Sequence, residues 1–195
     1  ALQEADRRFG ARASAIPIDL LSKETDYVPV PFESRRDSIG WHGNAILVKR
    51  HINILAQKVL TIPTLEPRGA VLADLAIGTQ QFRVVGMHLD LSGLWRRRQA
   101  HSILHQLEAM DGDVPEILMG DLNEWTAHRG CLHDFSRAHR IAHSAPSFHS
   151  QRPIARLDRI MASQDIVLID SGTHHSILAR RASDHLPVWA NIAFR

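Results

Sequence analysis

The chain of 195 residues has almost no cysteine and no long apolar run. Its single cysteine, Cys131, excludes a disulfide bond within the chain, and the neighbouring Gly130 and Leu132 offer nothing that would activate a catalytic thiol. No apolar segment approaches the ~18 residues that a membrane-spanning helix needs, and no segment resembles a secretory signal. We therefore expect a cytoplasmic protein without a transmembrane segment.

The chain also lacks a strong charge of one sign. It has 23 Lys and Arg against 21 Asp and Glu, a formal charge of +2, so no strong overall attraction to nucleic acid is expected. Only Lys23, Lys49 and Lys58 are lysines, and the guanidinium group of the many arginines suits phosphate oxygens. A genome biased toward arginine codons would give the same excess, so both explanations stay open.

The length suits one domain, residues 1–195, and the hydrophobic content of 44% is typical of a globular protein. The clearest elements are a hairpin formed by residues 69–77 and 81–89 and a helix over residues 95–110. Apolar side chains recur at helical spacing along this helix, at Ala100, Ile103, Leu104, Leu107 and Met110.

The other segments are shorter. Strands are predicted over residues 44–50, 52–60, 116–119, 157–161, 166–170, 174–178 and 188–194. Residues 5–15 and 127–132 are predicted to be helical, and residues 16–40, with three prolines, to be mainly loop. Many short strands with few helices favour an α/β fold in which two packed sheets are flanked by helices.

Polar side chains lie at or near the ends of five apolar segments. They are Glu4, His88, Asp121 with Asn123, Asp158, and Asp184 with His185. Each one alone is explained as well by a turn or a cap. Together, carboxylates and an imidazole at strand ends can hold a hard divalent cation and move a proton. Because no thiolates cluster with them, Mg²⁺ or Mn²⁺ suits this set better than structural Zn²⁺.

The segments that carry these residues follow one another in a characteristic order. They are Leu2-Gln3-Glu4, Gly43-Asn44-Ala45-Ile46-Leu47, Gly86-Met87-His88-Leu89, Gly120-Asp121-Leu122-Asn123, Arg156-Leu157-Asp158-Arg159-Ile160 and Ser183-Asp184-His185-Leu186-Pro187. In this order and spacing they resemble the endonuclease/exonuclease/phosphatase superfamily, which includes DNase I-like nucleases, AP endonucleases, inositol-polyphosphate phosphatases and bacterial sphingomyelinases. The resemblance implies a four-layer α-β-β-α sandwich.

The resemblance also assigns a metal site and an acid/base pair. Glu4 would be the main metal-binding carboxylate, and Asp184 would be a second ligand. Asp158 would orient the ring of His185 and raise its basicity. The family's first strand normally supplies an asparagine upstream of Glu4; since this chain starts later, we expect an N-terminally truncated domain.

The remaining roles concern the water and the phosphate. Asp121 and Asn123 would orient the nucleophilic water and a phosphate oxygen, and His88 would contact the scissile phosphate. Either His185 or Asp121 could take the proton; His185 is preferred because an imidazole titrates near neutral pH. Arg96, in the Arg-rich start of the long helix, is expected to bind a substrate phosphate, the alternative being a solvated or ion-paired helix end.

These inferences predict a monomeric metal-dependent hydrolase of phosphate ester bonds. One hypothesis is an endonuclease or exonuclease, with nucleic acid as the partner. The alternatives are a sphingomyelinase-like or inositol-phosphate-like phosphatase and, third, a non-catalytic binding module on the same fold.

Overall fold

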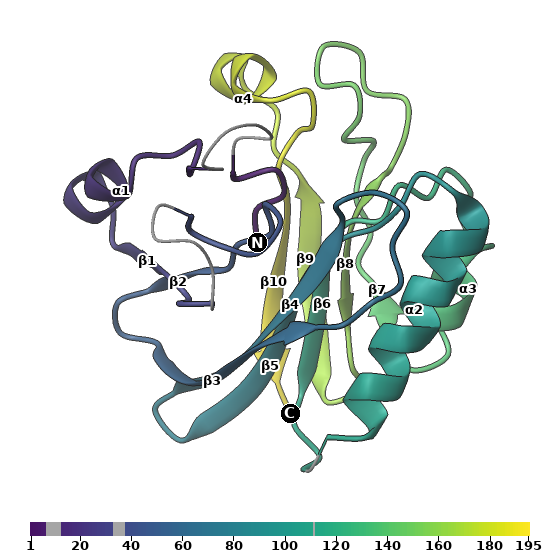
Figure 1. Ribbon diagram of the computed structural model, residues 1–195, viewed down its shortest axis with the longest axis horizontal. Helices are drawn as coiled ribbons and strands as arrows, with labels where there is room; N and C mark the ends of the chain where they lie inside the picture. Colours follow the sequence, from purple (N-terminus) through teal and green to yellow (C-terminus); the bar gives the residue numbers. More distant parts are fainter. Residues whose placement is uncertain (7–12, 33–37, 111) are drawn as a thin grey trace.

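The computed structural model describes residues 1–6, 13–32, 38–110 and 112–195. Its centre is a six-stranded mixed sheet in the order β3-β4-β5-β6-β8-β7 (Figure 1). The strands are β3 (Asn53–Leu60), β4 (Gly69–Ile77), β5 (Gln80–His88), β6 (Glu116–Asp121), β7 (Arg140–Ile141) and β8 (Asp158–Ala162). β5 and β6 run parallel, whereas the other neighbouring strands run antiparallel.

Two further two-stranded antiparallel sheets and four helices complete the described fold. β1 (Tyr27–Pro29) pairs with β2 (Leu47–Lys49), and β9 (Ile166–Thr173) pairs with β10 (Val188–Phe194). The helices are α1 (Ile18–Glu24), α2 (Gly93–Glu108), α3 (Cys131–Phe135) and α4 (Ile177–Ala182). The two small sheets form a second β layer, and α2 and α3 form the helical layer on the opposite side of the large sheet (Figure 1).

Alternation along the central strands builds a core on each face of the large sheet. On β4, Leu72 packs toward the helices, with Ile103 of α2 and Phe135 of α3. The neighbouring Val71 packs on the other face, where Val48 of β2 and Ile166 of β9 cover the sheet. The predicted α/β fold with two packed β layers and flanking helices is therefore confirmed.

Most predicted elements are present with small changes at their ends. The hairpin of β4 and β5 is confirmed almost residue for residue, and α2 begins two residues before its predicted start. The predicted helix over residues 127–132 is displaced to α3, because Gly130 has φ 59° and cannot continue a helix. The predicted helix over residues 5–15 lies largely on residues 7–12, outside the described residues.

Two predictions about secondary structure are wrong. Residues 174–178, expected as a strand, lead into α4, whose first turn is capped because Ser176 Oγ accepts a hydrogen bond from Ala179 N. The segment 16–40, expected to be mainly loop, contains α1 directly after Pro17. Proline immediately before a helix is favourable because its fixed φ is helical and its missing N–H would have no partner there.

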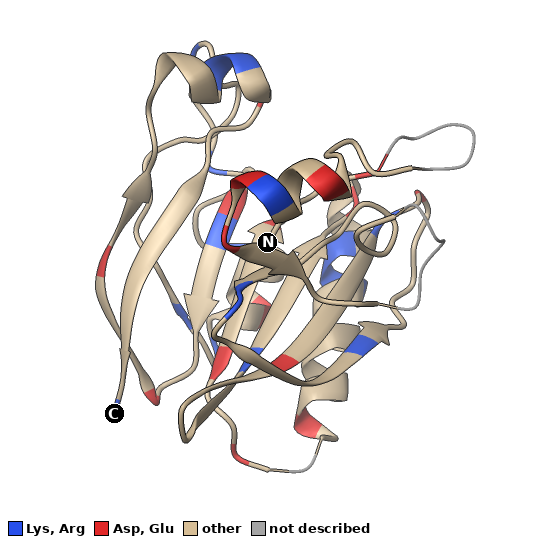
Figure 2. Cartoon of the chain, turned by 90° about the vertical axis from the view of Figure 1, so that its left-hand side faces the viewer, with Lys and Arg blue, Asp and Glu red and all other residues tan. Residues whose placement is uncertain are grey.

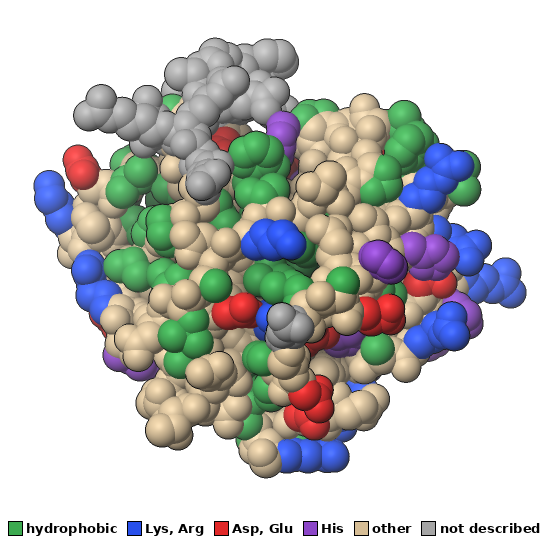
Figure 3. All heavy atoms as spheres, turned by 60° about the horizontal axis from the view of Figure 1, so that its bottom comes forward, with side chains coloured by type: hydrophobic (Ala, Val, Ile, Leu, Met, Phe, Trp, Pro, Cys, Tyr) green, Lys and Arg blue, Asp and Glu red, His purple; other side chains and the backbone are tan. Residues whose placement is uncertain are grey.

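Charged side chains are spread over the surface. On the face shown in Figure 3, acidic, basic and hydrophobic side chains are interspersed, which agrees with the formal charge of +2. Among the described residues, no helix combines the length and the apolar character needed to cross a membrane.

Candidate active site

Three of the predicted site residues lie in one row across the large sheet. In the register of the sheet, His88 at the end of β5 is paired with Asp121 at the end of β6, and Asp121 is paired with Asp158 at the start of β8. Paired residues of neighbouring strands point to the same face of a sheet, with Cβ atoms about 5 Å apart. The hydrogen-bonded sheet thus fixes the spacing of one imidazole and two carboxylates. We call His88, Asp121 and Asp158 the row.

A tight turn after β6 holds the next functional residue. Gly120 has φ 146°, and a Cβ there would lie 1.8 Å from the carbonyl oxygen of Met87, so only glycine lets β5 and β6 approach this closely. Asn123 follows in the left-handed region, at φ 50°. Its backbone N donates to Asp121 Oδ1 at 2.8 Å and its Nδ2 donates to the Leu89 carbonyl oxygen at 2.9 Å. Asn123 is therefore fixed beside Asp121.

The connection between α4 and β10 brings His185 to the same row. Its Nδ1 lies 2.9 Å from Asp158 Oδ2, and its Nε2 lies 4.0 Å from Asp121 Oδ2. The hydroxyl of Ser147 donates to the same oxygen of Asp158. Phe148 forms an isolated β-bridge with His185, and their ring centroids are 4.9 Å apart. The ring is oriented by a carboxylate on one edge and packed against an aromatic side chain.

The electrostatic surroundings give Asp121 and His185 opposite charges. Burial disfavours the charged form of His185, but the hydrogen bond and the charge of Asp158 outweigh it and raise the pKa of His185 to about 9. Burial likewise opposes ionisation of Asp121, but hydrogen bonds from His88 and from the Asn123 amide hold its pKa below the usual range. At neutral pH His185 is thus an imidazolium facing the carboxylate of Asp121, which removes the reason for preferring His185 over Asp121 as the proton acceptor.

Arg68 extends the row on the other side. Its Nη1 lies 3.0 Å from His88 Nδ1, and His88 Nε2 lies 3.3 Å from Asp121 Oδ2. Arg68 Nη1 also lies 2.5 Å from His88 Nε2, so the guanidinium contacts both nitrogens of the ring. Arg68 Nη1 also lies 3.6 Å from Glu4 Oε1, and its Nη2 lies 3.0 Å from Glu66 Oε2. Glu4 is connected to the row through these two basic side chains.

The two carboxylates expected to hold a metal ion border the same centre. Glu4 reaches it through Arg68, and its carboxylate is half exposed. Asp184 is exposed, adjoins His185 in the chain, and its charge adds to the proton affinity of that ring. Within the part of the chain that the structure describes, the closest group of metal-ligating types is a different one: Asp121, Asp158 and His185 offer atoms that all lie within 4.8 Å of one another.

The donor set around this centre suits a hard divalent cation. It consists of carboxylates and one imidazole, and the only cysteine, Cys131, is buried elsewhere, on α3. The amide of Asn44 lies beside Gly69, the residue paired with His88, and its Oδ1 is buried without a hydrogen-bond partner. An additional oxygen ligand or acceptor is therefore available at the border of the site.

Arg96 is placed differently from the sequence-based expectation. Its guanidinium is buried and lies 3.3 Å from Glu124 Oε2, and its Nη1 donates to the Leu91 carbonyl oxygen at 2.6 Å. The ion pair and the backbone contact occupy its donors, so the structure gives it a position in the core at the base of α2. The arginine that lies beside His88 is Arg68.

Arg68 and Ser147 were not identified from the sequence. Neither belongs to a recognisable motif, since the chain has many arginines and serines. The predicted hairpin nevertheless contained a signal for Arg68: pairing residues 69–77 with residues 81–89 sets the start of the first strand opposite His88, and Arg68 immediately precedes that start. No comparable local signal marks Ser147, which reaches Asp158 through an irregular connection.

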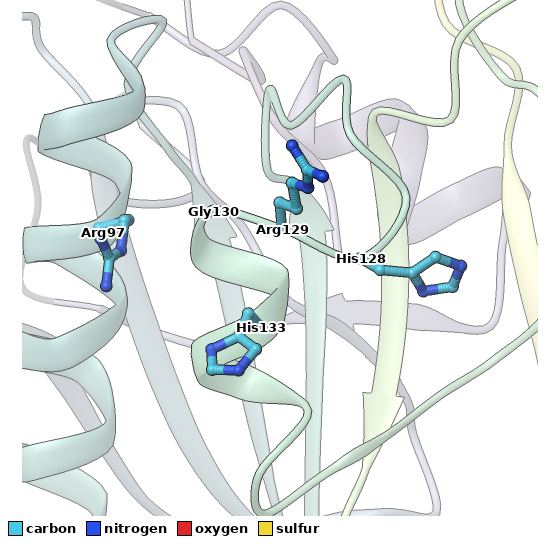
Figure 4. A pocket seen from close by; sticks show the side chains of 5 residues that line it. All are labelled: Arg97, His128, Arg129, Gly130 and His133. Atoms are coloured by element: carbon cyan, nitrogen blue, oxygen red, sulfur yellow. The ribbon is translucent and has the colours of Figure 1, made fainter.

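A second, basic hollow of about 230 Å³ lies outside the row. Its lining residues are Arg97, His128, Arg129, Gly130 and His133 (Figure 4). Arg97 is paired with the buried carboxylate of Asp134 at 3.3 Å, and His128 points away from Arg97. Because these side chains do not point toward one another, the hollow does not bring charged groups together as the row does.

Comparison with known families now decides the relationship. The model of the endonuclease/exonuclease/phosphatase family matches residues 1–185, which include every residue of the row and His185. The chain belongs to this family. Endonuclease/exonuclease/phosphatase proteins in general hydrolyse phosphate esters, and the family typically uses divalent metals. Among curated proteins, none matches the chain.

Solved structures of the endonuclease/exonuclease/phosphatase family share the fold. A member from Bacteroides vulgatus has a TM-score of 0.73 and 15% identity, over 91% of this chain and 80% of that one. The mannosyl-6-phosphatase of Bacteroides thetaiotaomicron has a TM-score of 0.63 and 19% identity, over 87% and 77%. D. rerio TDP2, complexed with a single-strand DNA product, has a TM-score of 0.69 and 14% identity, over 90% and 80%. At these identities the likeness establishes the fold alone.

Proposed function

We propose that the chain is a divalent-metal-dependent phosphoesterase in which water hydrolyses a phosphodiester or a phosphomonoester. The observation that carries the proposal is the row of His88, Asp121 and Asp158 on three adjacent strands, closed by an imidazole from the connection before β10. Hydrolysis of a phosphate ester needs a positioned water, neutralisation of the nonbridging oxygens and a proton for the leaving oxygen. The row offers one group or more for each task.

Asp121 and Asn123 would orient the attacking water. Asp121 stays ionised, so its oxygen accepts a hydrogen bond from the water, and Asn123 is held in place by its contacts with Asp121 and Leu89. His185 and Asp158 form the acid/base dyad: Asp158 holds Nδ1, which leaves Nε2 directed toward Asp121 and free to exchange a proton in the space between them.

Charge on the phosphate would be neutralised by basic side chains and by the metal ion. Arg68, which contacts His88 and lies 3.6 Å from Glu4, would supply a guanidinium to the phosphate on this side of the row, with His88 beside it. Glu4 and Asp184, with Asp121 as a further carboxylate, would hold Mg²⁺ or Mn²⁺. When bound, such an ion supplies positive charge to the phosphate oxygens and keeps several waters in its shell.

Both diesters and monoesters remain candidate substrates. Similar structures include one named as a mannosyl-6-phosphatase and one of TDP2 complexed with a single-strand DNA product, which supports testing sugar phosphates and nucleic acid alike. A nuclease is the first hypothesis. A sphingomyelinase-like or inositol-phosphate-like phosphatase is the second, and the apolar surface described in the next subsection favours a lipid diester within it.

The test is hydrolysis of bis(p-nitrophenyl) phosphate and p-nitrophenyl phosphate with added Mg²⁺ or Mn²⁺, and with EDTA as the metal-free control. Single-stranded DNA, abasic duplex DNA and inositol phosphates complete the panel. His185→Ala and Asp121→Ala should each lower kcat/KM at least ~10²-fold, as expected for the loss of an acid/base or positioning group.

A matched variant separates this loss from a general effect of removing an imidazole. His105 is exposed on α2, so His105→Ala should keep the parental rate. Rates of His185→Ala close to those of His105→Ala on every hydrolysed substrate would exclude the proposed dyad. Activity that survives EDTA would exclude the metal.

A further inference from the structure

The most exposed large hydrophobic side chains of the described residues lie on two segments near the row. Leu178 is 78% exposed, Ile177 is 77% exposed and Ile154 is 72% exposed. Isolated exposed hydrophobic residues are common on protein surfaces. Three aliphatic side chains with this degree of exposure on adjoining segments are less so, and we call Ile154, Ile177 and Leu178 the apolar tip.

Hydrogen bonds tie the two segments together. The connection between β7 and β8 carries Ile154, and α4 carries the other two residues of the apolar tip. Both Ser150 Oγ and Gln151 Nε2 donate to the carbonyl oxygen of Arg180 in α4, at 3.4 Å and 2.7 Å. In Figures 1 and 2, α4 and this connection form the upper end of the molecule. Ala179 is the buried residue of α4, so the helix packs inward through it and leaves its apolar neighbours in solvent.

The same two segments are strongly basic. Residues 147–156 and 174–183 contain four arginines and no Asp or Glu, although the whole chain has a formal charge of only +2. The arginines are Arg152, Arg156, Arg180 and Arg181, and all four are exposed. The blue stretch on α4 in Figure 2 marks its two arginine positions. Ile177 and Arg181 are four residues apart and share one face of the helix.

The two segments that carry the apolar tip reach the row at one of their ends. Ser147 and Phe148, at the start of the first segment, contact Asp158 and His185. Ser183, at the end of the second, precedes Asp184 and accepts a hydrogen bond from the His185 backbone N at 3.1 Å. Both segments that carry the apolar tip are thus connected to Asp158 and His185 at their ends.

We propose that the apolar tip and its four arginines dock on an anionic phospholipid bilayer and present the row to headgroup phosphates. This deepens the proposed function and rests on it, because it names phospholipids as the substrate class. Aliphatic side chains beside arginines suit a bilayer interface: the aliphatic groups enter the boundary of the acyl chains while the guanidinium groups remain among the lipid phosphates. A flat nucleic acid backbone would offer the arginines phosphates but no apolar medium for three aliphatic side chains.

Co-sedimentation with vesicles measures docking without any turnover. Vesicles of equal parts phosphatidylglycerol and phosphatidylcholine should bind the chain, and vesicles of phosphatidylcholine alone should bind it much less. Ile177→Ser combined with Leu178→Ser should lower the partition coefficient on anionic vesicles at least about tenfold. The matched control is Ile169→Ser, since Ile169 is 65% exposed on β9 and lies outside the two segments.

The electrostatic part has its own variants. Arg180→Gln and Arg181→Gln should each weaken binding to anionic vesicles about fivefold, whereas Arg137→Gln, at an exposed arginine after α3, should leave it unchanged. Far-UV circular dichroism melting checks that all variants fold. The proposal would be supported if the double variant Ile177→Ser, Leu178→Ser no longer docked and hydrolysed vesicle lipid more slowly, but kept its turnover of a soluble diester.

Three results would overturn it. One is absence of binding to anionic vesicles by the parental chain. Another is equal binding by the apolar-tip variant and Ile169→Ser. The third is loss of single-stranded DNA binding, but not vesicle binding, in the arginine variants, which would assign this surface to nucleic acid. Hydrolysis of soluble diesters by a chain that does not dock would leave the proposed function intact, and docking without hydrolysis of any substrate would refute that function alone.

Discussion

The buried ion pair between Arg96 and Glu124 should be a determinant of stability rather than of substrate binding. Arg96 is 7% exposed and Glu124 is 3% exposed, and the carboxylate also accepts hydrogen bonds from the backbone N and hydroxyl of Thr126. Arg96→Ala would leave a buried carboxylate without its countercharge, which typically destabilises a protein by about 3–5 kcal/mol. For a chain of this size, that corresponds to a melting temperature lower by roughly 6–20 °C.

Calorimetric melting and steady-state kinetics together test this prediction. Glu124→Gln combined with Arg96→Ala should be less damaging than the sum of the single changes, because the double variant buries no unpaired charge. Arg98→Ala is the control: Arg98 is exposed and stacks over Trp95 at 5.1 Å, so its loss should cost no more than about 1 kcal/mol. If Arg96→Ala melted like Arg98→Ala while KM rose tenfold, Arg96 would be a phosphate-binding residue and our reasoning would fail.

Three further predictions concern titration and packing. Folding raises the pKa of His185 from 6.5 to about 9, so the contribution of this group to stability is fully present below pH 6.5. The free energy of unfolding, measured with urea, should fall by about 3 kcal/mol as the pH rises through 9, and Asp158→Asn should remove most of this fall. Burial raises the pKa of Cys131 to about 12, so iodoacetamide at pH 8 should alkylate the thiol only after unfolding, and mass spectrometry showing modification of the folded chain would contradict the buried position. Gly120→Ala places a Cβ 1.8 Å from a backbone oxygen and should lower the free energy of unfolding by more than about 4 kcal/mol or prevent folding. Gly78→Ala, at φ 58° with no atom near the new Cβ, should lower it by only about 1–2 kcal/mol, and similar melting of the two variants would argue against the close approach of β5 and β6.

The elements predicted well from the sequence are those whose pattern is set by one dominant interaction. Alternating apolar residues over 69–77, followed by a turn and the segment 81–89, predict a hairpin, and β4 and β5 match it; their burial on both faces goes beyond what the alternation indicates. Residues 174–178 were predicted as a strand, and the two aliphatic residues of this segment, Ile177 and Leu178, lie in α4. They are exposed, and the cap by Ser176 determines the helix. Local capping competed with an apolar pattern, and periodicity alone does not distinguish the two.

The candidate site was predicted to the extent that strand ends determine it. His88, Asp121 and Asp158 were placed at strand ends from the sequence, and the sheet register brings them into one row. The environment of Arg96 could also have been inferred, because residues 96, 100, 103 and 107 share the buried face of α2. The proton affinity of His185 could not, since it depends on distances to Asp158 and Asp121 that only the tertiary structure sets.

Because His88, Asp121 and Asp158 lie on neighbouring strands of a hydrogen-bonded sheet, their spacing is set by the register of that sheet. The surrounding connections add Ser147, Phe148 and His185, which contact Asp158 or one another. Replacing the rest of the connection between β7 and β8, or α4, would therefore change the surface beside the candidate site while the strand-end residues keep their positions. Loop grafting between homologous chains that retains these three residues would test which segment selects the substrate.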